Sequence, residues 1–235
     1  MNKKGQLTVF IILGIVILLV AGLGIYFYSK STQSISRDLP SIAVVQKEAE
    51  PVSSFVTACL EKTLEDASRH IGSRGGVYDS SSLSYNFLNP TTQGTNAVQL
   101  SKDSKIVIPY WHYMSSDDKC DEVGKCELTE SIPKREAIKL NLEKYVNKNI
   151  KTCLGEFEDF TQKGISVQEL SEPKSTVYIQ QNTVGVLLEY KLKVTAQNTQ
   201  INLDKFTSKI QLNLNEILNL ASTITLEEQK YSFLE

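Results

Sequence analysis

The chain has 235 residues with 25 basic and 27 acidic side chains, so its formal charge of −2 is close to neutral. A basic domain or a basic stripe is the usual sign of nucleic-acid binding. Because the composition shows neither, no nucleic-acid partner is expected. The length leaves room for one folded domain beside a membrane segment.

Residues 7–28 form an apolar run of 22 residues without a charge or a proline. A helix of this length extends about 33 Å, which matches the hydrocarbon thickness of a bilayer. Apolar side chains surround it on every side, whereas a helix of a soluble domain keeps one polar face. The run is also longer than the apolar part of a cleaved secretory signal, the competing interpretation. We therefore expect one transmembrane helix, with the lipid bilayer as a partner.

A short basic leader, residues 1–6, precedes this run and contains Lys3 and Lys4. Positive charge beside a membrane helix favours the cytoplasmic side. The amino terminus is therefore expected in the cytoplasm and the carboxy-terminal domain outside the cell. The bias is small, because Lys30 and Arg37 follow the helix.

The leader ends in Gly5 and Gln6, and this order before a long apolar helix resembles the class III (prepilin-type) signal peptides of archaeal type IV pilin-like proteins. In that family a membrane peptidase cleaves after the glycine and leaves the apolar helix on the mature protein. The resemblance implies cleavage between Gly5 and Gln6. Thr8 fits the family pattern, but Phe10 stands where pilins often carry a glutamate that serves filament assembly. The family also includes membrane-anchored surface proteins that do not polymerise.

Residues 29–50 are polar, include Pro40, and predict a stalk or linker, so the extracytoplasmic domain is expected at residues 51–235. Pro51 and Gly72 bracket an amphipathic helix, and a glycine turn follows at Gly75. The segment from this helix to the turn is similar to uncharacterised membrane-anchored proteins of archaea, which implies a surface location and no particular activity.

A second amphipathic helix is expected between Pro133 and Gly164. An even number of cysteines outside the cytoplasm predicts two disulfides, and four cysteines permit three pairings. Because each helix carries one cysteine on its apolar stripe, we favour Cys59 with Cys153 and Cys120 with Cys126. The alternative is four reduced thiols in a cytoplasmic domain.

Residues 105–114 predict a strand that Pro109 confines to a sheet edge or a strand end. Tyr110, Trp111 and Tyr113 in this segment form a candidate platform for a carbohydrate or another ligand, since their rings combine an apolar body with a polar tip. The same cluster is also typical of aromatic residues that pack on their own domain.

After Gly164 the apolar period changes toward two, which predicts strands. We expect them at residues 165–170, 175–181, 184–196 and 206–214, with a hairpin between the second and third and a final helix at 216–231. The predicted fold class is α+β, with two amphipathic helices packed on an antiparallel sheet.

The sequence carries no pattern that predicts catalysis, because its two histidines, His70 and His112, lie far apart and no nucleophile or metal-ligand spacing surrounds them. We expect no enzyme, no cofactor and no metal. The leading hypothesis is a single-pass surface protein with a structural or binding domain. A pilin-like subunit that assembles with copies of itself through the 7–28 helix is the alternative. A membrane-anchored enzyme, with a pocket lined by His112 and Tyr110, is the second.

Overall fold

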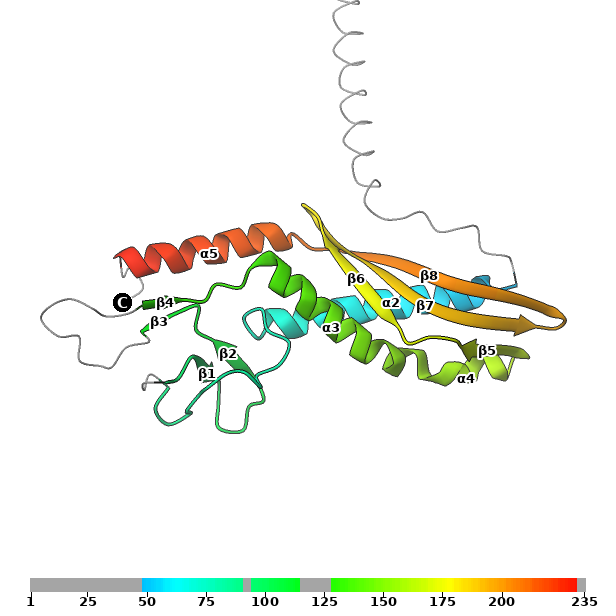
Figure 1. Ribbon diagram of the computed structural model, residues 1–235, viewed down its shortest axis with the longest axis horizontal. Helices are drawn as coiled ribbons and strands as arrows, with labels where there is room; N and C mark the ends of the chain where they lie inside the picture. Colours follow the sequence, from blue (N-terminus) through cyan, green and yellow to red (C-terminus); the bar gives the residue numbers. More distant parts are fainter. Residues whose placement is uncertain (1–47, 91–93, 115–127, 232–235) are drawn as a thin grey trace, which may run out of the picture. The chain divides into compact units, whose positions relative to one another are not determined.

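Helices and an antiparallel sheet make up the folded body, which a computed structural model describes over residues 48–90, 94–114 and 128–231 (Figure 1). This arrangement confirms the predicted α+β class. The predicted leader, the transmembrane helix and most of the stalk lie outside these ranges. The main elements are α2 (Glu50–Gly72), α3 (Arg135–Leu154), β5 (Ile165–Glu169), β6 (Lys174–Ile179), β7 (Thr183–Ala196), β8 (Thr199–Gln211) and α5 (Leu214–Tyr231).

Helix α2 has the predicted proline in its first turn and extends one residue beyond the predicted bounds at each end, since it begins at Glu50 and includes Gly72 as its last residue. A proline is tolerated there because the first helical N–H groups have no partner within the helix. The apolar residues recur every three or four positions and are buried: Val52, Val56, Cys59, Leu60, Leu64, Ala67 and Ile71. The helix therefore turns one continuous apolar side toward the core.

Helix α3 is shorter than predicted, because it ends at Leu154 instead of continuing to Gly164. Gly155, Glu156 and Phe157 all have positive φ angles, between 53° and 59°, which no right-handed helix accommodates. A short helix, α4 (Glu158–Thr161), follows and buries Phe160. Buried Phe157 and Phe160 continue the apolar spacing past this break. The sequence pattern therefore does not reveal where α3 ends.

A disulfide between Cys59 and Cys153 joins α2 to α3, as the facing cysteine stripes predict. The two Cα atoms lie 5.7 Å apart and 94 residues separate them in the chain. Beside the bond, the ring of Phe55 meets the ring of Phe160 edge to face at a centroid distance of 5.3 Å. The other predicted pair, Cys120 with Cys126, lies outside the described residues.

The four-stranded sheet is built around β7, which pairs with β8 along its full length. On its other edge β7 pairs first with β6 and then with β5, all antiparallel. The predicted hairpin between β6 and β7 is confirmed. Alternate residues of β7 belong to the core that the helices cover: Val184, Val186, Leu188, Tyr190, Leu192 and Val194. In the first half of the strand the intervening Thr183, Gly185 and Leu187 are buried as well, so burial alternates only from Leu188 onward.

Strand β8 occupies residues 199–211 and not the predicted 206–214, so this prediction is wrong in its bounds. Pairing with β7 is irregular between Glu189 and Leu192, where two β7 residues lie opposite Asp204 alone. Such a bulge shifts the alternation of inward and outward side chains. The buried and partly buried side chains of β8 therefore alternate in two series that are out of phase, with Ile201 and Leu203 before the shift and Phe206, Ser208 and Ile210 after it. Leu214, predicted as the last residue of this strand, begins α5 instead.

Polar side chains of α3 bond to the outer edge of β6, where no further strand of the described body pairs. Val177 N–H donates to Glu143 Oε1 at 2.8 Å, and Ser175 N–H donates to Asn147 Oδ1 at 2.6 Å. The Arg135 guanidinium donates to the carbonyl of Ile179. Positions 135, 143 and 147 are separated by multiples of four, so these residues lie on one side of the helix. An edge strand whose backbone groups are occupied does not recruit another strand.

Loss of the Cys59–Cys153 bond should lower the free energy of unfolding by up to about 4 to 5 kcal/mol, because the bond closes a long loop in the unfolded chain. The double variant Cys59→Ala/Cys153→Ala tests this in urea unfolding of the full chain, followed through the fluorescence of Trp111, the only tryptophan. The matched control is Cys120→Ala/Cys126→Ala, which should lose less, because the bond expected between these two cysteines would close a much shorter loop. Equal unfolding midpoints for wild type and the first variant would contradict the prediction.

Candidate functional site

The main candidate site is an apolar hollow of about 120 Å³ where the end of α2, the start of α3 and α5 meet. Cavities of similar size, about 150 Å³ and lined by apolar groups, stay dry and bind molecules such as benzene. The lining comes from four separate parts of the chain: Ser68, Ile71, Gly72, Gly75, Gly76, Trp111, Ile138, Leu142, Leu212, Leu214, Ile217, Leu218 and Ala221.

The polar atoms in the lining have partners within the protein. Trp111 Nε1–H donates to the carbonyl of Gly75 at 3.1 Å, and Ser68 Oγ–H donates to the carbonyl of Leu64 at 2.9 Å. The hollow therefore offers contact area without free hydrogen-bonding groups from these two side chains. Its chemistry suits a small apolar group such as a hydrocarbon chain end or an aromatic ring, and not an anion or a metal ion.

One wall of the hollow is the glycine turn after α2, which the sequence predicts. Gly75 and Gly76 have φ angles of +61° and +96°, a conformation that side chains rarely adopt. A Cβ atom on Gly76 would lie 3.0 Å from Pro133 Cγ, and one on Gly75 would lie 3.1 Å from Ile108 Cγ2. The turn therefore needs glycine for its backbone conformation and for the close approach of its neighbours.

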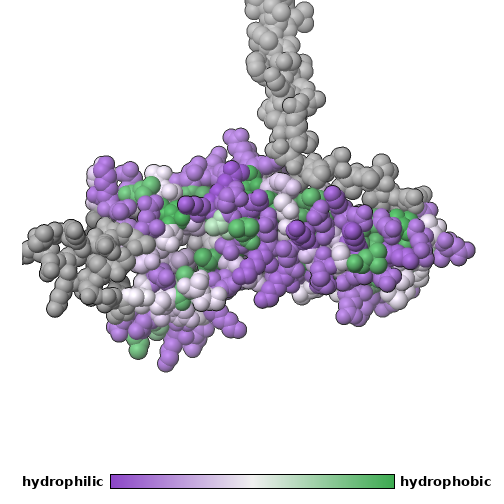
Figure 2. Space-filling model, in the orientation of Figure 1, coloured by the Kyte–Doolittle hydropathy of each residue, from purple (hydrophilic) through white to green (hydrophobic). Residues whose placement is uncertain are grey.

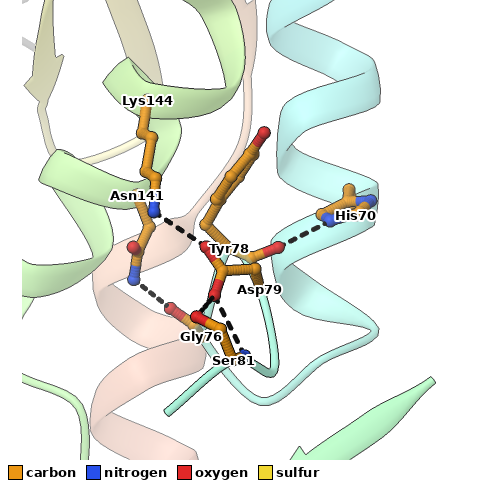
Figure 3. Close-up of polar contacts among 7 residues, drawn as sticks. All are labelled: His70, Gly76, Tyr78, Asp79, Ser81, Asn141 and Lys144. Atoms are coloured by element: carbon orange, nitrogen blue, oxygen red, sulfur yellow. Dashed lines mark hydrogen bonds and ion pairs between the residues drawn. The ribbon is translucent and has the colours of Figure 1, made fainter. Parts of the chain in front are cut away.

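A polar network holds the segment after this turn against both long helices (Figure 3). Asn141 Nδ2–H of α3 donates to the carbonyl of Gly76 at 2.8 Å, and Lys144 Nζ of α3 lies 2.8 Å from Asp79 Oδ2. On the other side, His70 Nε2 of α2 lies 2.9 Å from the carbonyl oxygen of Tyr78. The network thereby fixes the wall of the hollow from two directions.

The two partners of His70 indicate which of its ring nitrogens donates and which accepts. Arg74 lies 3.0 Å from Nδ1 of His70, and a guanidinium can only donate, so Nδ1 accepts. Nε2 then carries the hydrogen that bonds to the carbonyl of Tyr78. His70 therefore connects the end of α2 to the following segment through these two hydrogen bonds, a structural role.

Asp79 is the charged centre of the same network. A hydrogen bond from Lys144, followed by bonds from the side chain and backbone of Ser81, holds the pKa of Asp79 well below its ordinary value. The Lys144 ammonium also lies 4.6 Å from the centre of the Tyr78 ring, within range of a cation–π interaction. Both contacts keep the segment after the turn on α3.

A second, open hollow lies beside the end of α3, and Lys151, Glu156 and Glu169 are among its lining residues. Lys151 Nζ lies 3.0 Å from Glu169 and 2.9 Å from Glu172, and hydrogen bonds to these two carboxylates raise its pKa. Burial raises the pKa of the neighbouring Tyr190, so its phenol stays protonated. Lys151 thus holds two carboxylates from the segment that follows α4, which is the pattern of a structural ion cluster.

The predicted aromatic platform is divided between two short hairpins. The predicted strand at 105–114 splits into β2 (Val107–Pro109) and β3 (His112–Met114), which pair with β1 (Ala97–Gln99) and β4 (Leu128–Glu130). Tyr110 Oη–H donates to the carbonyl of Pro90 at 3.1 Å, and burial raises its pKa. Trp111 lines the apolar hollow, and Tyr113 is half-buried on β3. Of the three residues, Trp111 alone is part of the lining.

The sequence does not predict that α5 lines the hollow. Leu214, Leu218 and Ala221 recur at helical spacing, which predicts an amphipathic helix but not the surface that it covers. The other predicted site residues, Cys120, Cys126, Gly5 and Gln6, lie outside the described residues.

Within residues 48–90, 94–114 and 128–231, no group of three or more histidine, cysteine or acidic side chains is arranged to hold a metal ion. The same residues contain no helix whose length and apolar character would suffice to cross a membrane. The apolar run at 7–28 lies outside them.

Comparison of the chain with models of protein families, with curated proteins and with solved structures yields no match. The class of protein therefore rests on the chain itself: an α+β body with two cross-linked helices, one polar sheet face and an apolar hollow.

Replacing Gly76 by alanine should destabilise the body by about 1 to 3 kcal/mol, because the left-handed backbone and the contact with Pro133 both resist a Cβ atom. Gly72→Ala is the matched control, since a Cβ atom there has no neighbour within 4 Å. It should leave stability unchanged or raise it by up to about 1 kcal/mol. Urea unfolding of the two variants measures the difference, and equal shifts in the same direction would contradict the explanation.

Proposed function

We propose that the chain is a single-pass, membrane-anchored cell-surface protein whose extracytoplasmic body is a binding or structural module without catalytic activity. The apolar run at 7–28 supplies the anchor, and the basic leader favours a cytoplasmic amino terminus. The observation that carries the proposal is the disulfide between Cys59 and Cys153. Structural disulfides persist in oxidising compartments and are rare in the cytoplasm.

The hollow beneath α5 supports a binding role for the body. It combines an apolar lining with a rigid wall that the glycine turn and the polar network hold in place. A preformed apolar hollow with few polar groups is the usual form of a site for an apolar ligand group. We propose a hydrocarbon or aromatic moiety as the class of ligand that this hollow accepts.

A pilin-like subunit is the alternative function, and the Gly5–Gln6 junction before the apolar run favours it. In this case the leader is removed and the mature chain assembles with other copies through its first helix. The second alternative is a membrane-anchored enzyme. Neither of the two hollows described above is lined by His112 or Tyr110, so nothing in them favours that class over the others.

The proposed topology predicts that protease added to intact cells expressing the full chain digests the body while a cytoplasmic marker protein stays intact. Cys59 and Cys153 should be recovered as one linked peptide in a non-reducing map and should resist alkylation until a reductant is added. Lysed cells serve as the control for protease activity. A body that is protected until lysis, or thiols that alkylate freely in living cells, would overturn the proposal.

Processing at the leader separates the anchored protein from the pilin-like alternative. If a prepilin-type peptidase acts on the chain, intact-mass measurement should find a mature protein that begins at Gln6. Gly5→Val should block this cleavage, and Asn2→Ala, the control within the leader, should not. Retention of residues 1–6 in wild type contradicts the pilin-like alternative, whereas cleavage together with sedimenting filaments supports it.

A further inference from the structure

Helix α5 carries an apolar stripe that the rest of the described body leaves uncovered. Its inner side, with Leu218 and Ala221, lines the hollow. Beside this inner side lie Ile217, Leu220, Ile224 and Tyr231, which are 51%, 63%, 42% and 61% exposed. Ile217 stands at the border, because it also lines the rim of the hollow. Figure 2 shows apolar surface over α5 among hydrophilic neighbours. Contiguous exposed apolar surface on a folded protein marks an interaction site.

The spacing of this stripe is that of a two-helix seam. Steps of three, four and seven residues connect Ile217, Leu220, Ile224 and Tyr231, as in the a and d positions of a heptad. Glu227 occupies the one seam position between Ile224 and Tyr231. A helix with this pattern buries its stripe by inserting the side chains between those of another helix.

We propose that the occupant of this seam is α5 of a second copy of the chain, packed antiparallel. Glu216 and Lys230 both lie on one flank of the seam, directly before Ile217 and Tyr231. In an antiparallel pair, Glu216 of each copy lies beside Lys230 of the other, so two opposite-charge contacts form around a two-fold axis near Thr223. Leu220 then lies beside Ile224 of the second copy at the centre.

A parallel pair lacks this complementarity, because flanking residues there meet partners five positions later. Glu216 would then lie beside Ala221 of the second copy, and among residues 214–231 no opposite charges would meet. The antiparallel pair also places the positive end of each helix dipole beside the negative end of the other. Charge therefore selects the antiparallel arrangement.

The proposed pair is weak and reversible. A helix of 18 residues is about 27 Å long, so the pair lies at the small end of specific interfaces. Glu227 adds a cost, since it lies beside Ile217 of the second copy. Covalent trapping therefore suits this contact better than a sizing experiment.

Thr223→Cys in the full chain places a thiol beside the two-fold axis, and mild oxidation should link two copies through it. Asn219→Cys, one helical turn before Thr223, is the matched control: in the antiparallel pair the two residues 219 lie roughly 10 Å apart along the helices, too far for a disulfide, so this variant should form no more linked dimer than wild type. Non-reducing electrophoresis measures the dimer, and peptide mapping identifies the bond. Absence of a disulfide between the introduced thiols of two copies, or a link from residue 223 to another segment of the same copy, overturns the proposal.

The apolar seam and the charge contacts are tested in the Thr223→Cys background. Adding Ile224→Lys should lower the linked dimer about tenfold, whereas Leu226→Lys should not, although the two side chains are 42% and 43% exposed. Glu216→Lys should weaken linking, and Glu216→Lys with Lys230→Glu should restore it. Unchanged linking in the Ile224→Lys variant, or failure of the charge exchange to restore it, contradicts the antiparallel pair. Urea unfolding of each variant verifies that the body is folded.

Discussion

The fold depends on two antiparallel helices that bury their apolar sides against the same face of one sheet. Side chains of α2, α3 and β7 form one continuous core. Cys59 and Cys153 join the helices inside that core, so neither helix can slide along the other while the bond is intact. The sheet and the glycine turn are therefore both positioned by this fixed pair.

The two ends of the pair formed by α2 and α3 differ in the side chains that fill them. At one end, the rings of Phe55, Phe157 and Phe160 fill the space beside the disulfide. At the other end lies the glycine turn, where Gly75 and Gly76 have no side chains to fill the space. A hollow therefore remains beneath α5. Because polar contacts from both helices hold the turn, the hollow is preformed and does not depend on a ligand for its shape. The hollow thus lies at the end of the core that these three phenylalanine rings do not fill.

The sequence predicts the parts of the fold that depend on simple periodicity. The stripes of α2 and α3, the disulfide between them and the β6–β7 hairpin follow from spacing alone. Two local backbone events escaped prediction: the left-handed residues from Gly155 to Phe157, because apolar residues continue past them, and the bulge opposite Asp204, because it disrupts the alternation. The hollow escaped because its lining joins segments more than a hundred residues apart, and Trp111 gave the only local signal.

The bonds from α3 to the outer edge of β6 have a consequence for molecules crowded side by side. A neighbouring chain that approaches this edge meets amides already bonded to Glu143 and Asn147. It would have to displace these side chains before adding a strand. Sheet extension in this direction, the first step toward amyloid-like fibres, is therefore blocked in the native state itself.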